Sequence, residues 1–256
     1  MYLKSEKLLV NQLEYLKKKF KLQGIKAEFE AEGSSVDDLS RLRRITNSID
    51  TKLFIKIGGV EAVNDLYSCI ELGVNGIIAP MVETKFGLQK FIQSIKKFKI
   101  LKKPHLSINI ETKDGMKNHK EIIKYSGGFI DNITIGRSDL SASYFNPKVT
   151  PDSEFIFKKI LTIAKYAKKF GITTTVGGSV SLKTIQAYSK KYLLKKLIHR
   201  LETRKVILPS NIFLKNKNAL KEALAFEEKY IIYKKELSEM KLLPELSRLT
   251  ILKTRN

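Results

Sequence analysis

The chain has 256 residues, of which 43% are hydrophobic, and it carries a formal net charge of +22 at pH 7. This length and apolar content can fill one large barrel or two small domains. The single cysteine, Cys69, excludes an internal disulfide and a cysteine-only metal site. The sequence contains no apolar run near the about 18 residues of a membrane span. Its N-terminus, MYLKSEKLLVNQLEYLKKK, is too charged for a signal peptide, so we expect a cytoplasmic protein.

The positive charge has two interpretations. It can mark a nucleic-acid or membrane-surface partner, or it can be a lysine-rich bias spread over solvated helix faces. Of the 48 basic residues only eight are Arg, and the Lys form short clusters on nearly every expected helix. No basic arm or RNA-binding aromatic motif collects them. We favour the compositional interpretation and expect neither a nucleic-acid nor a membrane partner, although the field would attract anionic substrates.

Strand and helix patterns alternate along the chain. Apolar spacing predicts a first helix at residues 8–20, and period-two alternation predicts a strand at 25–32, ending at Gly33. A last long helix is expected at 218–241, before the polar, basic tail LTILKTRN. Between them we expect strands at 53–57, 76–81, 105–110, 133–138, 172–176 and 198–208, and helices at 36–49, 60–72, 85–98, 153–170 and 182–192, with one more helix between the fourth and fifth strands.

This alternation predicts an α/β fold of the TIM-type (β/α)8 barrel with a long C-terminal helix. Seven strands are expected, so the eighth is missing, irregular or hidden near the N-terminus. An open doubly wound sheet is the alternative, but no Gly-rich phosphate motif follows the first strand. We expect a single domain over residues 1–256, with an N-terminal helix in 1–24, the barrel in 25–208 and the C-terminal helix and basic tail in 209–256. The protruding last helix favours a homo-oligomer.

Two expected strands end at a carboxylate. Glu111 follows the segment SINI, and Asp139 follows ITIGRS. Because the carboxyl ends of parallel strands meet at one edge of the sheet, both carboxylates should reach the same edge. Two hard oxygen ligands there suit Mg²⁺ or Mn²⁺. The alternative is that each carboxylate is a helix N-cap or a surface acid.

Other polar side chains recur near strand ends. We expect apolar layers to fill the barrel interior, so charged residues near strand ends should line its C-terminal face. The candidates are Glu30, Glu32, Lys56, Glu83, Asn109, Arg137, Glu202 and Arg204. Among them, Glu83 and Arg204 are candidates for substrate binding. Arg204 and Glu202 either hold a second anion or form a structural ion pair.

Four segments carry a resemblance to a known family. KIGGVEAVNDL, GVNGIIAPMVET, SINIET and ITIGRSDLSAS resemble the HpcH/HpaI aldolase and citrate lyase β-subunit family, within the pyruvate/phosphoenolpyruvate barrel superfamily, over about residues 25–208. The resemblance implies a divalent-metal-dependent carbon–carbon lyase that forms or cleaves a bond next to a 2-oxo acid or acyl thioester. It also implies Glu111 and Asp139 as ligands of Mg²⁺ or Mn²⁺, with Asn109 beside them. The amides around Ser138 and Asp139 would hold the substrate carboxylate, so the resemblance makes Asn109 and Ser138 candidates for substrate binding.

The chain departs from the family pattern at three catalytic positions. The family's strand-end Arg aligns with Lys56, which we expect to share the charge of an enolate; the alternative is a lysine at the rim. Arg137 stands where related aldolases often have a small or neutral residue. It could bind an extra anionic group on the substrate, or form an ion pair with Glu83 or Glu32.

The third departure is a missing histidine. Related aldolases carry a His for proton transfer in the loop that here reads Glu30-Ala31-Glu32-Gly33. The histidines present, His105, His119 and His199, are expected to be structural. Glu30 or Glu32 could act as the base instead, if burial raises its pKa.

Two other functions remain open from the sequence. One is a non-catalytic barrel that binds an anionic metabolite or nucleic acid through its basic surface. The other keeps the barrel but changes the reaction to phosphoenolpyruvate chemistry, for which the matched motifs offer less support.

Overall fold

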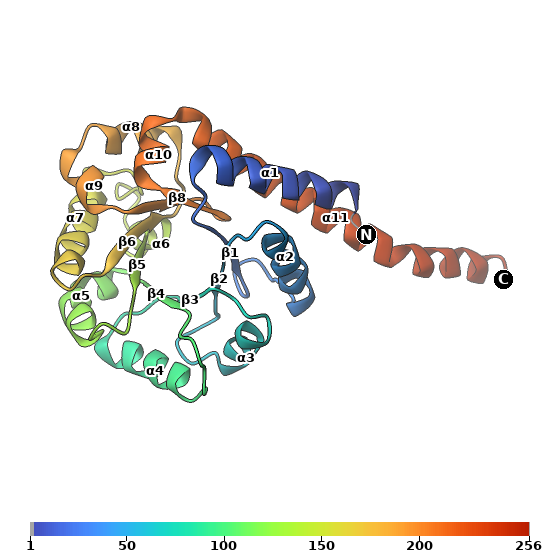
Figure 1. The fold of residues 1–256 in the computed structure, drawn as a ribbon, viewed down its shortest axis with the longest axis horizontal. Coiled ribbons are helices and arrows are strands. Elements are labelled where there is room, and N and C mark those ends of the chain that lie inside the picture. The colour runs from blue at the N-terminus through green and yellow to red at the C-terminus, as the bar shows by residue number, and fades with distance from the viewer. Residues whose placement is uncertain (1–2, 256) are drawn as a thin grey trace.

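Eight strands close into a barrel in chain order, β1 to β8, in the computed structural model, which describes residues 3–255 (Figure 1). Strands β1 to β7 run parallel, as the alternation of strands and helices predicted. The closed barrel confirms the predicted fold class and excludes the open sheet. The strands are β1 (Gly24–Glu28), β2 (Leu53–Lys56), β3 (Gly76–Ala79), β4 (His105–Asn109), β5 (Asn132–Gly136), β6 (Thr173–Gly177), β7 (Arg200–Glu202) and β8 (Val206–Pro209).

The eighth strand is the irregular one. The sequence predicted a single strand at 198–208, but this segment folds into a hairpin of β7 and β8. Strand β8 is antiparallel to both β7 and β1, so it closes the barrel without the usual helix before it. The hairpin turn, residues 203–205, lies at the C-terminal end of β7. It therefore shares an edge with the ends of the other parallel strands.

Helices surround the barrel, with α2, α3, α4, α5 and α7 forming most of an outer ring (Figure 1). Side chains that cap helix N-termini begin four of these, for example Ser35, which exchanges hydrogen bonds with Asp38 in a capping box. Short helices α6, α9 and α10 were not predicted. The helices are α1 (Lys4–Phe20), α2 (Val36–Ser48), α3 (Val63–Glu71), α4 (Lys85–Lys96), α5 (Lys113–Tyr125), α6 (Arg137–Ala142), α7 (Glu154–Lys169), α8 (Leu182–Ser189), α9 (Tyr192–Leu197), α10 (Ser210–Lys215) and α11 (Lys217–Lys253).

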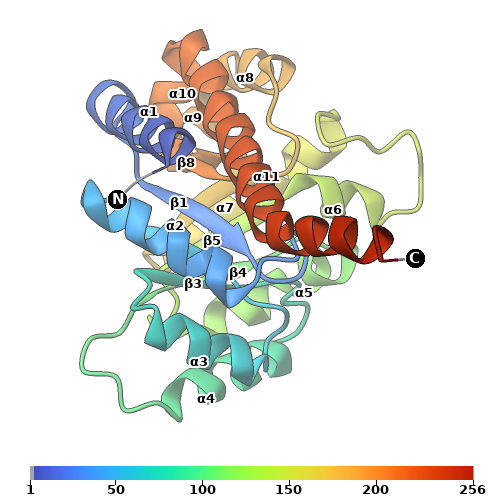
Figure 2. The same ribbon diagram turned by 90° about the vertical axis from the view of Figure 1, so that its right-hand side faces the viewer.

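The first and last helices pack side by side outside the ring (Figures 1 and 2). Gln12 of α1 donates to the Glu222 carboxylate at 2.8 Å and accepts from Lys229 at 2.6 Å, both on α11. Helix α11 continues through Pro244 to Lys253, so the predicted end at residue 241 and the predicted tail were wrong. None of the helices within residues 3–255 is long and apolar enough to cross a membrane.

The barrel lumen is polar, which contradicts the expectation of apolar layers. Along β1, Ile25 and Ala27 belong to the main hydrophobic core, whereas the alternate residues Lys26 and Glu28 line a pocket at the barrel mouth. Inside the lumen, hydrogen bonds join Ser107, Asn132, Thr134 and Thr175 of neighbouring strands. A separate small apolar cluster consists of Phe54, Ile78 and Ile207.

Candidate functional site

A pocket of about 340 Å³ opens at the C-terminal ends of the parallel strands, where (β/α)8 barrels place their sites. We call it the strand-end pocket. Residues from β1, β2, β4, β5, β6 and β7, or from the turns after them, line it. They are Lys26, Glu28, Ala31, Lys56, Asn109, Glu111, Thr134, Gly136, Ser138, Asp139, Gly177, Gly178, Ser179, Glu202, Thr203 and Arg204.

Glu111 is a buried carboxylate just after β4, with 3% of its surface exposed. It accepts hydrogen bonds from the Met81 backbone N–H at 3.1 Å and from the Asn109 side-chain amide at 2.9 Å. Gly136 leaves room for it, because a Cβ at that position would overlap the carboxylate. Burial raises the pKa of the Glu111 carboxyl, although nearby Lys56 acts to lower it. A buried carboxyl group whose pKa is raised in this way is typical of functional sites.

Asp139 reaches the same pocket from the first turn of α6. Strand β5 ends at Gly136, two residues before the predicted end, so Asp139 lies on a helix rather than at a strand end. Its side chain is exposed and lines the pocket together with Glu111. The charge of Asp139 adds to the rise in the Glu111 pKa. The structure therefore brings together the two carboxylates that the sequence singled out.

The donors around this pair suit a hard divalent cation. Beside the two carboxylates, the buried Oδ1 of Asn109 has no hydrogen-bond partner among the described residues. Residues 3–255 hold no cluster of three or more His, Cys, Asp or Glu side chains placed to bind a metal. A cation at this position would therefore complete its shell with water or substrate oxygens. Mg²⁺ commonly binds in this way, through one or two carboxylates.

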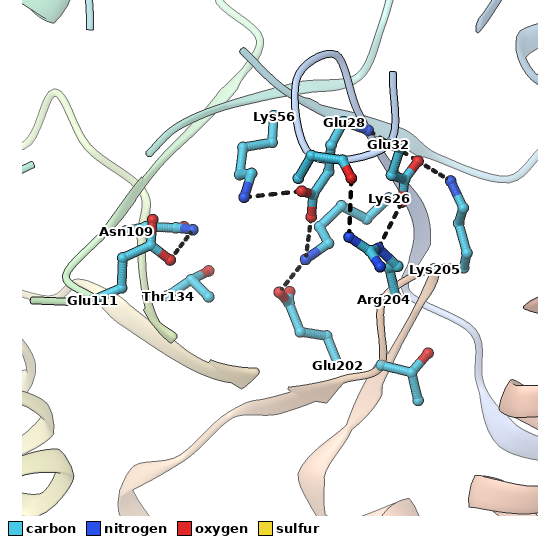
Figure 3. Close-up of polar contacts among 12 residues, drawn as sticks. Lys26, Glu28, Glu32, Lys56, Asn109, Glu111, Thr134, Glu202, Arg204 and Lys205 are labelled. Carbon is cyan, nitrogen blue, oxygen red and sulfur yellow. Dashed lines mark hydrogen bonds and ion pairs between the residues drawn. The ribbon is translucent and has the colours of Figure 1, made fainter. Parts of the chain in front are cut away.

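A row of alternating charges crosses the pocket from β7 to β2 (Figure 3). Lys26 Nζ lies 2.8 Å from Glu202 Oε1 and 3.2 Å from Glu28 Oε1, and Lys56 Nζ lies 2.9 Å from Glu28 Oε2. We call Glu202, Lys26, Glu28 and Lys56 the charge row. Lys56, at its end, faces Glu111 closely enough to affect the pKa of that carboxyl.

The two central groups of the charge row keep each other ionised. Burial acts to lower the pKa of Lys26, but Glu202 and Glu28 more than offset this and raise it. Burial acts to raise the pKa of Glu28, but Lys26 and Lys56 lower it overall. At neutral pH, the pocket wall therefore presents fixed charges of both signs.

The hairpin turn positions Arg204 at the pocket rim. Its guanidinium donates to the Ala31 carbonyl at 3.2 Å, and its Nε lies 3.5 Å from Glu32 Oε1. The side chain of Arg204 is 51% exposed. Of the two alternatives for Arg204 and Glu202, the structural pair between them is not formed, because Glu202 is bound to Lys26 and Arg204 lies beside Glu32. Arg204 thus has room to meet a ligand.

The predicted bases Glu30 and Glu32 both lie outside the strand-end pocket. Strand β1 ends at Glu28, and the chain turns over residues 29–33, where Gly33 has a φ of 55°. Glu30 is exposed and lies against Gly58. Glu32 forms an ion pair with Lys205, whose ammonium lies 4.6 Å from the centre of the Tyr230 ring on α11.

Arg137 and Glu83 also lie away from the pocket lining. Arg137 is fully buried behind it and pairs with Asp152 at 2.6 Å, rather than with Glu83 or Glu32. Its guanidinium also donates to the carbonyls of Gly177 and Gly178, at 3.2 and 2.6 Å. Arg137 therefore supports the pocket wall and does not reach the cavity.

Ser138 faces the pocket at the start of α6. Its hydroxyl lies 2.8 Å from that of Ser179, on the turn after β6. Gly178, with a φ of 79°, packs closely over the backbone amides of Arg137 and Ser138, where a Cβ would come within 2.6 Å of the Ser138 nitrogen. The structure thus brings a serine pair and a close backbone turn to the side of the pocket that holds Asp139.

The three histidines lie outside the strand-end pocket lining. His105 begins β4, at the opposite end of the barrel, as the sequence indicated. His119 lies within α5, where its Nδ1 is 2.6 Å from the Met116 carbonyl. The Nδ1 of His199, just before β7, accepts from the Thr174 backbone N–H at 3.1 Å.

Sequence reasoning missed several pocket residues, above all Lys26 and Glu28. The signal was present in the alternation of IKAEFE, which places Lys26 and Glu28 on one face of β1. We expected ligands only at strand ends, and so selected Glu30 and Glu32, which lie two and four residues beyond the end of β1 at Glu28. Ser179, Thr134 and Thr203 carried no comparable pattern.

Comparisons with known proteins identify a family for this chain. A family model described as HpcH/HpaI aldolase/citrate lyase matches residues 34–185, more than half of the chain. The match includes Lys56, Glu111 and Asp139. No curated protein matches the sequence at a significant level.

Solved structures share the fold at low sequence identity. An HpcH/HpaI aldolase/citrate lyase family protein from Burkholderia cenocepacia J2315 superposes with a TM-score of 0.62 at 11% identity, covering 86% of this chain and 89% of that one. An HpcH/HpaI aldolase from Desulfitobacterium hafniense DCB-2 gives 0.60 at 10% identity, covering 76% and 81%. RipC from Yersinia pestis gives 0.53 at 13% identity, covering 80% and 87%.

Proposed function

Because the chain belongs to the HpcH/HpaI aldolase/citrate lyase family, we propose that it is a divalent-metal-dependent carbon–carbon lyase acting next to a 2-oxo acid or acyl thioester. The observation that carries this proposal is the meeting of Glu111 and Asp139 in the strand-end pocket, beside the unpaired oxygen of Asn109. Glu111 and Asp139 would hold Mg²⁺ or Mn²⁺. A bound divalent cation supplies a Lewis acid that stabilises the negative charge of an enolate.

Lys56 is proposed to share that negative charge. It occupies the end of β2, where the sequence aligns it with the family's Arg, and it lies between Glu28 and Glu111 in the pocket. Its ammonium is fixed by Glu28, so little reorganisation is needed when charge develops on the substrate oxygen. Lysine offers a point charge rather than the planar fork of Arg. It is therefore suited to one oxygen rather than to a bidentate contact.

Glu28 is proposed as the base in place of the missing histidine. It is the carboxylate of β1 that lines the pocket, and its lowered pKa keeps it ionised at neutral pH. In the cleavage direction, Glu28 would accept the proton of the substrate's 4-hydroxyl group. The bond between C3 and C4 then breaks, giving an aldehyde and the enolate of the 2-oxo acid, which takes up a proton at carbon.

The rim of the pocket favours an anionic substrate. Arg204 is half exposed there, and Ser138 and Ser179 offer hydroxyls to the same pocket. A substrate with a second anionic group would contact Arg204 without displacing Lys26 or Lys56 from their carboxylates.

Two substrates that differ in whether a base must remove a proton test this proposal. Retro-aldol cleavage of a 4-hydroxy-2-oxo acid needs a hydroxyl proton removed, whereas oxaloacetate decarboxylation does not. With Mn²⁺ or Mg²⁺ present, Glu28→Gln should lower kcat for cleavage by about 10²–10⁴-fold and affect decarboxylation much less. Glu83→Gln, the same change outside the pocket lining, serves as the control. Metal-independent rates, or no turnover of either substrate by the native protein, would contradict the proposal.

A further inference from the structure

The barrel lumen contains a second cavity, distinct from the strand-end pocket. It has a volume of about 40 Å³ and lies toward the N-terminal ends of the strands. We call it the lumen cavity. Lys52 precedes β2, and His105 and Arg200 are the first residues of β4 and β7. These three side chains bring nitrogen atoms to a lumen that is otherwise lined by neutral and apolar groups, apart from Glu202.

Arg200 carries a positive charge that no carboxylate of residues 3–255 meets in a close ion pair. Its guanidinium donates one hydrogen bond, to Asn132 Oδ1 at 3.3 Å. The charge of Glu202, two residues further along β7, acts to raise the pKa of Arg200, but the Glu202 carboxylate is bound to Lys26. A guanidinium has five N–H donors, and a half-buried cation without a close ionic partner is costly.

His105 brings its ring to the same space. Its ring packs edge-on against Phe54 with 5.5 Å between the ring centres, and its Nδ1 is buried with no hydrogen-bond partner among the described residues. Burial, followed by the charge of Arg200, lowers the pKa of His105 to about 4. The ring is therefore neutral at pH 7 and adds no charge to the cavity.

The acids near the cavity are already paired. Glu202, which lines it, is bound to Lys26. The Asp131 carboxylate accepts the Leu106 backbone N–H at 2.7 Å and pairs with Lys103 at 3.3 Å. Lys52 is exposed at the cavity entrance, and its charge acts on His105 in the same direction as that of Arg200. The positive electrostatic potential in the cavity therefore favours the binding of an anion.

We propose that the lumen cavity binds a small inorganic anion beside the guanidinium of Arg200 and against the ring of His105. The anion supplies a close counter-charge to Arg200 and accepts charge-assisted hydrogen bonds from its free N–H groups. The cavity exceeds the about 10–15 Å³ that one water needs, so an ion of the size of chloride or phosphate fits, but a nucleotide does not.

The anion would be connected to the strand-end pocket by hydrogen bonds. Asn132 accepts from Arg200 and donates to Thr134 Oγ1 at 3.2 Å, and Thr134 lines both cavities. The binding of the anion does not depend on the proposed lyase reaction. A result against one of the two proposals therefore does not contradict the other.

The three histidines allow a direct test on the full-length protein. The imidazole signals of ¹⁵N-labelled protein are followed while chloride or inorganic phosphate replaces gluconate, a bulky anion, at a constant ionic strength of about 0.1 M. We expect the His105 signals to shift saturably with at least one of the two anions. His119, which packs against Tyr166 on the outer helices, should not move. Unchanged His105 signals with both anions would overturn the proposal.

Variants assign the effect to Arg200. Loss of one charge-assisted hydrogen bond should weaken binding by about 10- to 100-fold in Arg200→Gln. Arg200→Lys keeps the charge and should retain more of the affinity. Lys195→Gln removes an exposed charge of α9 and should leave binding unchanged. Equal affinity in folded Arg200→Gln would contradict the site, and if this variant does not fold, the saturable shift in the native protein and in Arg200→Lys decides.

Discussion

Lys26 Nζ lies 2.8 Å from Glu202 Oε1, and this buried ion pair joins the first strand of the barrel to the seventh. The two strands are not neighbours, because β8 lies between them. Lys26 also holds Glu28 in place for Lys56. One side chain thus stabilises the closure of the barrel and sets the charges of the strand-end pocket.

Removing the charge of Lys26 should destabilise the protein strongly. Lys26→Met leaves Glu28 and Glu202 buried with less compensation, which typically costs about 3–5 kcal/mol. Urea unfolding at pH 7 measures the change. Lys235→Met, which breaks an exposed pair with Glu239, should cost less than about 1 kcal/mol. Similar small effects in both variants would show that the ion pair of Lys26 with Glu202 contributes little to stability.

Glu111 should make stability depend on pH in the absence of metal. Its pKa in the folded chain is raised above the ordinary 4.5, so the folded state binds the proton more tightly than the unfolded state. The contribution of Glu111 to the free energy of unfolding therefore falls as pH rises from 4.5 through the raised pKa. Glu111→Gln should remove this fall. A stability difference between variant and native protein that does not change with pH would contradict the assignment.

Gly136 should be required for the position of the Glu111 carboxylate. A Cβ at residue 136 would overlap the Glu111 side chain, although the backbone φ of −82° suits any residue. Gly136→Ala should therefore weaken divalent-cation binding by about 10-fold or more without removing a charge. Gly59→Ala is the matched control, because nothing lies within 4 Å of a Cβ there. Isothermal titration with Mn²⁺ compares the two variants, and equal affinities would oppose the prediction.

Arg137 should be structural rather than catalytic. Arg137→Met leaves Asp152 without its ionic partner and leaves the carbonyls of Gly177 and Gly178 without this donor, so we expect a loss of about 3–5 kcal/mol in unfolding free energy. Arg248→Met, on the exposed end of α11, should change stability by less than about 0.5 kcal/mol. If Arg137→Met instead keeps native stability and loses substrate affinity, Arg137 acts on the substrate.

The barrel could be predicted from the sequence because each strand–helix unit is a local pattern. Glu111 and Asp139 were found for the same reason, since both follow strong apolar strands. The hairpin of β7 and β8 could not be found in this way. Its turn uses Thr203, Arg204 and Lys205, none of which is a typical turn residue, and Thr203 Oγ1 accepts the Val206 N–H at 3.1 Å to hold it.

The charge row was missed because its contacts are not local. Alternation in β1 places Lys26 and Glu28 on one face, but a polar strand face usually indicates solvent. Glu202 and Lys56 come from other strands and contact Lys26 and Glu28 only in the folded barrel. These ion pairs allow the polar face of β1 to point into the lumen. Arg137 shows the converse, since its position near a strand end suggested the pocket, whereas its partner Asp152 holds it behind the wall.

The most direct test of the lyase account is Mn²⁺ binding with and without oxalate, a planar mimic of the pyruvate enolate. The native protein should bind Mn²⁺, and oxalate should tighten the binding. Glu111→Gln and Asp139→Asn should each lose most of the affinity, and Glu83→Gln should keep it. If the Glu111 and Asp139 variants bind Mn²⁺ as the native protein does, the two carboxylates are not metal ligands and the central claim is wrong.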